Sequence, residues 1–160
     1  MDHERYSDDY LRRILTEVRT IAVVGASPRR ERPSHRVMAY LQRRGYRAIP
    51  VNPFAARTKI NGETCHARLA DVPEPVDMVD VFRRSAAAAE VVDAAIATRV
   101  KVIWMQLGVR DDVAAARAEA QGIRVVMNRC PAIEIPRLGL PPVGPRSALA
   151  SSGRPLRPLQ

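Results

Sequence analysis

Arginine side chains recur in turns of this sequence that directly follow short apolar runs. The first of these turns lies in the stretch VGASPRRERPSHR, which contains one glycine and four arginines, Arg32 among them. Later turns carry Arg83 and Arg110. The planar guanidinium fork matches the geometry of phosphate oxygens, so turns that meet at one edge of a fold would form a phosphate or pyrophosphate site. The alternative interpretation is that these arginines are solvated loop residues.

A second candidate chemistry is nucleophilic attack by a thiol. Cys130 follows an apolar run in the sequence NRCP, and Arg129 together with His66 could lower the pKa of its thiol. Structural packing is the alternative role for Cys130. A metal site built from Cys65, His66 and Cys130 would lack a fourth ligand and the CxxC or HxxH spacing of zinc sites. We therefore predict no metal site.

Apolar runs alternate with segments of helical spacing through residues 20–127. The runs are TIAVVG, RAIPV, VDMVDVF, VKVIWMQL and IRVVM, which are typical of strands buried on both faces. The predicted helices are 7–18, 34–45, 85–98 and 111–122. This rhythm of right-handed βαβ units predicts an α/β fold that is Rossmann-like and doubly wound, with a mainly parallel five-stranded sheet and helices on both faces.

Capping residues and composition set the expected boundaries. Ser34 and Asp111 are the predicted N-caps of two of the helices. Residues 1–137 are predicted to form a single domain. The sequence from residue 138 onward is rich in proline, serine, glycine and arginine and has no hydrophobic periodicity. Residues 138–160 are therefore predicted to be a disordered tail.

The overall composition limits the classes of protein to consider. The 160 residues are 46% hydrophobic and 4% aromatic, with a net charge of +9. No apolar run approaches the ~20 residues that a membrane helix needs, and the polar, acidic N-terminus is unlike a secretory signal. Two cysteines make no disulfide framework, so we expect a soluble cytoplasmic protein with reduced thiols. Nucleic-acid binding by the basic tail is the least favoured function because no motif for reading bases is present. The sequence does not decide whether the protein forms a homo-oligomer.

The first turn departs from ordinary nucleotide motifs. Only Gly25 remains of the G-x-G-x-x-G pattern of dinucleotide sites, and the P-loop pattern is missing. NAD sites place an acid at the end of the second strand to bond the ribose hydroxyls. Here Asn52 and Pro53 occupy that position, which tolerates a phosphorylated ribose because no carboxylate repels the phosphate.

Resemblance to a known family is carried by four separated stretches: GASPRRERPSHRVMAYLQRRGYRAIPVNP, VDMVDVFRR, VIWMQLGV and VVMNRCP. They resemble the stand-alone CoA-binding domain family, which is similar to the nucleotide-binding domain at the start of the succinyl-CoA synthetase alpha subunit. The resemblance covers residues 20–138 and implies a cofactor, coenzyme A or an acyl-CoA. The binding residues that it implies are Gly25, Ala26, Ser27, Pro28, Arg32, Pro33, Ser34, Asn52, Pro53, Phe82, Arg83, Gln106 and Gly108.

The same resemblance bears on catalysis. The ligase's catalytic histidine lies in a later domain that has no counterpart in this sequence. The expected function is therefore binding of CoA or an acyl-CoA without ligase activity. A thiol-dependent enzyme, carrying out acyl transfer or redox chemistry with Cys130 next to bound CoA, is the alternative.

Overall fold

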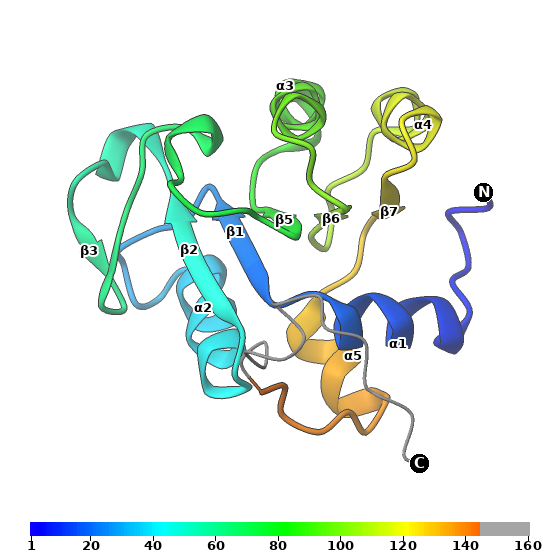
Figure 1. The fold of residues 1–160 in the computed structure, drawn as a ribbon, viewed down its shortest axis with the longest axis horizontal. Coiled ribbons are helices and arrows are strands. Elements are labelled where there is room, and N and C mark those ends of the chain that lie inside the picture. Colours follow the sequence, from blue (N-terminus) through cyan, green and yellow to red (C-terminus); the bar gives the residue numbers. More distant parts are fainter. Residues whose placement is uncertain (145–160) are drawn as a thin grey trace, which may run out of the picture.

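A five-stranded sheet forms the centre of the computed structural model, which describes residues 1–144 (Figure 1). Its strands are β1 (Thr20–Val24), β2 (Arg47–Val51), β5 (Met78–Val81), β6 (Val102–Met105) and β7 (Arg124–Val126). Their order is β2-β1-β5-β6-β7, and neighbouring strands all pair in parallel. The predicted Rossmann-like α/β class is confirmed.

Helices cover both faces of the sheet (Figure 1). One face carries α1 (Asp8–Glu17), α2 (Pro33–Arg43) and α5 (Pro131–Arg137), and the other carries α3 (Ser85–Ala97) and α4 (Asp112–Ala120). Each face has its own apolar cluster. Along β5, Met78 packs into the cluster under α1, α2 and α5, and Val79 packs into the cluster under α3 and α4. The alternating side chains of the strands therefore support two cores.

The strand order reverses at β1, which lies between β2 and β5. In open parallel sheets, ligands bind beyond the carboxyl ends of the strands at such a reversal. Gly25 follows β1 with φ +90°, and a Cβ atom there would lie 2.3 Å from the carbonyl oxygen of Phe82. Only glycine therefore fits between the ends of β1 and β5 at the first turn.

The two predicted helix caps had different outcomes. Asp111 is an N-cap, since its carboxylate accepts a hydrogen bond of 3.0 Å from the backbone N–H of Ala114. The prediction for Ser34 was wrong: α2 begins at Pro33, and Arg32 occupies the N-cap. Proline favours the first helical position because its fixed φ suits the helix and it has no N–H to satisfy.

Three features of the fold were not predicted. Residues 131–137 form α5, the short strands β3 (Lys59–Ile60) and β4 (Glu63–Thr64) form a hairpin, and 3-10 helices span Pro53–Ala55 and Leu69–Asp71. The packed chain also continues past the predicted boundary at residue 137. Leu138 and Leu140 are buried, and the N–H of Val143 donates to the Arg44 carbonyl at 2.9 Å.

The rest of the predicted tail, 145–160, lies outside the described residues. Among residues 1–144, no helix has the length and apolar character needed to cross a membrane.

Candidate functional site

Two cavities adjoin at the carboxyl edge of the sheet, and both are lined by Pro33 and Phe82. The smaller, of about 320 Å³, has four further predicted site residues in its lining: Gly25, Ser27, Arg32 and Ser34. The larger, of about 590 Å³, has four others: Arg83, Gln106, Gly108 and Cys130. Residues from five separate segments of the sequence therefore gather around these two neighbouring cavities.

The remaining predicted site residues, Ala26, Pro28, Asn52 and Pro53, do not line these two cavities. The side-chain amide of Asn52 donates to the carbonyl of Ala26 at 2.8 Å, and its oxygen accepts from the N–H of Phe54 at 2.9 Å. Pro53 is exposed and begins a 3-10 helix, and Pro28 is exposed in the loop after β1. Asn52 thus ties the end of β2 to the turn after β1.

Ser34 has a similar supporting role within the smaller cavity. Its hydroxyl accepts a hydrogen bond of 3.0 Å from the backbone N–H of Ser27, and the residue is 4% exposed. The bond holds the loop after β1 against the first turn of α2. It leaves the N-terminus of α2, with the partial positive charge of the helix dipole, beside the smaller cavity.

Exposed arginines form the rim of the two cavities. Arg32 lines the smaller one, and Arg36, Arg83 and Arg84 line the larger one. Within residues 1–144, none of the four pairs with a carboxylate. Arg36 was not predicted, although its spacing of four residues from Arg32 places both on one side of α2. This arginine rim is available to a bound anion.

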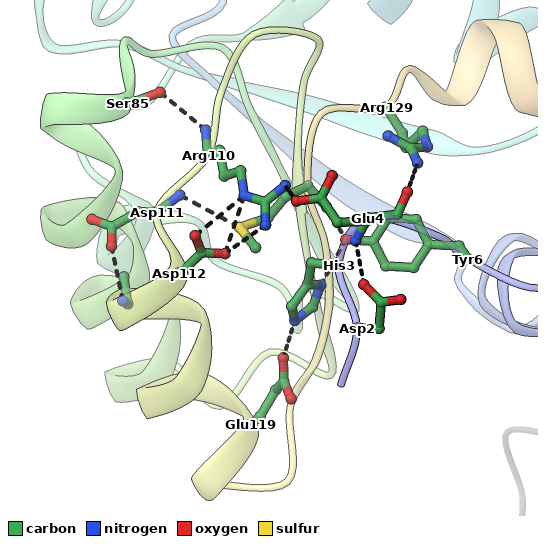
Figure 2. Close-up of polar contacts among 12 residues, drawn as sticks. Asp2, His3, Glu4, Tyr6, Ser85, Arg110, Asp111, Asp112, Glu119 and Arg129 are labelled. Carbon is green, nitrogen blue, oxygen red and sulfur yellow. Dashed lines mark hydrogen bonds and ion pairs between the residues drawn. The ribbon is translucent and has the colours of Figure 1, made fainter.

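Arg110 does not belong to the arginine rim, contrary to the expectation from its turn. Its guanidinium contacts Glu4 at 2.7 Å and Asp112 at 3.1 Å (Figure 2). Glu4 belongs to an N-terminal segment that is anchored nearby, because His3 bonds to Glu119. The charge of Arg110 is therefore already balanced within the protein.

A polar pair lies behind the larger cavity. Asp80, on β5, is completely buried, and the side-chain amide nitrogen of Gln106 donates to both of its carboxyl oxygens, at 3.1 and 3.2 Å. Burial raises the pKa of Asp80 to about 8, against the opposing effect of the Gln106 hydrogen bond. Asp80 is not among the predicted site residues, although an acid inside a run of buried strand residues was the available signal.

Cys130 lines the larger cavity and is 6% exposed. Burial raises the pKa of its thiol, and the nearby Asp80 adds to the increase. Hydrogen bonds from Gln106 and from backbone N–H groups of α5 act in the opposite direction but are smaller effects. The thiol therefore stays protonated at neutral pH, and protonated thiols are poor nucleophiles.

Two residues considered for a metal site, Cys65 and His66, lie beside β2. His66 hydrogen-bonds along the edge of β2, its N–H donating to the Pro50 carbonyl at 3.0 Å. Cys65 is buried beside it, and burial raises the pKa of its thiol. Among residues 1–144, the histidine, cysteine and acidic side chains form no group of three that could hold a metal ion.

Comparisons with known proteins identify the family of this chain. Residues 19–136 match a family model described as a CoA binding domain. The Bacillus subtilis (strain 168) protein YneT, whose function is uncharacterized, is 35% identical over 120 residues, which cover 75% of this chain and 87% of YneT.

Solved structures share the fold. A Thermus thermophilus protein, cell-free ID.343, has a TM-score of 0.79 and 39% identity, with 83% of this chain and 99% of that chain covered. The dinucleotide-forming acetyl-coenzyme A synthetase 1 of Ca. Korarchaeum cryptofilum has a TM-score of 0.59 and 24% identity, with 69% of this chain and 26% of that chain covered. At this identity, the synthetase supports the fold alone.

Proposed function

Since the chain belongs to the CoA-binding domain family, we propose that it binds coenzyme A or an acyl-CoA at the carboxyl edge of its sheet, without ligase activity of its own. The observation that carries the proposal is the arginine rim around two adjoining cavities at the strand-order reversal. Charge-assisted bonds from guanidinium groups to phosphate oxygens are among the strongest polar contacts available to a protein.

The chemistry of the edge suggests how the ligand lies. The N-terminus of α2 and Arg32, beside the smaller cavity, suit the pyrophosphate. Asn52 at the end of β2 brings no negative charge toward the ribose, so a 3′-phosphate is accepted there. The pantetheine arm then extends into the larger cavity, past Phe82 and toward Gln106. This arrangement favours CoA over NAD. NAD sites use an acid at the end of the second strand to bind the ribose hydroxyls, and this chain has Asn52 there.

Calorimetric titration tests the proposal. We expect CoA to bind, dephospho-CoA to bind more weakly, and NAD and ATP to bind more weakly still. Arg32→Ala and Arg83→Ala should each lower the CoA affinity by roughly 5- to 150-fold, which corresponds to about 1–3 kcal/mol for a charge-assisted contact. Arg110→Ala is the matched control, because its charge is balanced by Glu4 and Asp112. Unchanged affinity in both rim variants would remove the phosphate argument.

A non-catalytic role also fits the groups around the cavities. The thiol of Cys130, the alternative nucleophile, is buried and its pKa is raised, which disfavours thiolate chemistry. Of the three histidines, His3, His35 and His66, none lines either cavity. We propose a cytoplasmic location because reduced thiols persist in that compartment.

A further inference from the structure

The larger cavity has a charged mouth and an uncharged floor. Arg36, Arg83 and Arg84 are exposed and form part of its mouth. The residues of its floor are each less than a tenth exposed and carry no charge: Val37, Gln106, Val109 and Cys130. A ligand that enters past the arginine rim therefore leaves the cationic region as it goes deeper.

The polar groups of the floor are held in place from behind. The amide nitrogen of Gln106 bonds to Asp80, which fixes the orientation of the Gln106 side chain at the cavity wall. Cys130 stands beside this pair, within the electrostatic influence of Asp80. The floor thus offers apolar surface from Val37 and Val109, together with two neutral groups that can hydrogen-bond.

We propose that this floor binds the acyl end of a thioester, and that it selects uncharged acyl groups. The proposal rests on the proposed function, since the pantetheine arm must bring the thioester into the larger cavity. Val37 and Val109 contact the hydrocarbon of the acyl group, and the Cys130 thiol, a hydrogen-bond donor, faces the thioester carbonyl. The Gln106 amide nitrogen stays bonded to Asp80. An acyl group that ends in a carboxylate would meet no cation at the floor to compensate for the hydration that it loses there.

A ligand series on the unaltered protein tests the inference. Butyryl-CoA and succinyl-CoA have acyl chains of equal length, and only succinyl-CoA carries a terminal carboxylate. We expect calorimetry to give butyryl-CoA an affinity about tenfold higher than that of CoA, which is part of the gain from burying its methylene and methyl groups. Succinyl-CoA should bind no more tightly than CoA. Equal affinities for CoA and butyryl-CoA would overturn the inference and leave CoA binding itself intact.

A variant pair locates the effect. Val37→Phe adds volume at the floor, so the ratio of butyryl-CoA affinity to CoA affinity should fall to about one. Val113→Phe is the matched control, because Val113 is 71% exposed on α4 and lines neither cavity. If the ratio survives in Val37→Phe, the floor is not the acyl site. If Val37→Phe does not fold, the series on the unaltered protein decides. Absence of binding by every ligand would refute the proposed function instead.

Discussion

Asp80 is expected to make the stability of the protein depend on pH. Burial raises its pKa to about 8, from an ordinary value of 3.8. Between these two pH values, the folded protein retains a proton that the unfolded chain has released. The free energy of unfolding therefore falls as the pH rises from about 4 to about 8, and this contribution levels off at higher pH.

The size of the effect follows from the same two pKa values. Each pH unit crossed with the proton fully retained lowers the free energy of unfolding by about 1.4 kcal/mol, which sets an upper limit of about 6 kcal/mol. The adjoining cavity allows local relaxation around the ionised carboxylate, which makes its ionisation less costly than this limit. We therefore expect a loss of about 2–3 kcal/mol across this range.

Asp80→Asn removes the titrating group and keeps nearly the same shape. Urea unfolding at about pH 5, 7 and 9 should show the variant gaining stability relative to the unaltered protein as the pH rises, by about 2–3 kcal/mol in total. Asp93→Asn is the control, because Asp93 is an exposed residue that pairs with Arg117 at 3.0 Å. Parallel pH dependences for the unaltered protein and Asp80→Asn would refute the reasoning.

Three further outcomes can be measured directly. Gly25→Ala should lower the free energy of unfolding by about 2–4 kcal/mol in urea titrations, because the new methyl group meets the Phe82 carbonyl at a positive φ; a loss below about 0.5 kcal/mol would contradict the close contact. A chain truncated after Arg137 should lose about 2–4 kcal/mol through the loss of Leu138 and Leu140, and unchanged stability would show that they contribute little. Iodoacetamide at about pH 7 should label Cys130 more slowly than an unfolded control; equal rates would indicate an accessible thiolate.

Local patterns were enough to predict most of the elements. The run TIAVVG contains β1 and the glycine that ends it, and Asp111 is placed correctly as a cap because its side chain bonds within the next turn of chain. The same kind of reasoning misplaced the start of α2 by weighing the Ser34 hydroxyl and not Pro33. Both residues suit the start of a helix. In the structure the Ser34 hydroxyl does not cap α2, and it accepts a hydrogen bond from the Ser27 N–H instead.

Contacts between distant segments could not be predicted. Arg110 was assigned to an anion site from its position after a strand, but its partner Glu4 lies at the other end of the chain, so no local pattern reveals the pair. Similarly, the pKa of the Cys130 thiol is raised mainly by its burial in the folded protein, and Asp80 on β5 adds to the increase. The sequence could place arginines and a cysteine at the right edge of the sheet. It could not show which of these arginines pair with carboxylates in the folded protein.

β5 and the turn after it place charged and uncharged groups close together at the carboxyl edge of the sheet. β5 and the turn that follows contribute Asp80 behind the cavity, Phe82 between the two cavities and Arg83 at the rim. Side chains alternate along the strand, so Asp80 points away from the side on which Val79 and Val81 pack against α3 and α4. The chain leaves the sheet after Val81, and only then can an arginine reach solvent without losing its hydration. The end of this one strand therefore separates the buried Asp80 from the exposed arginine at the mouth of the larger cavity.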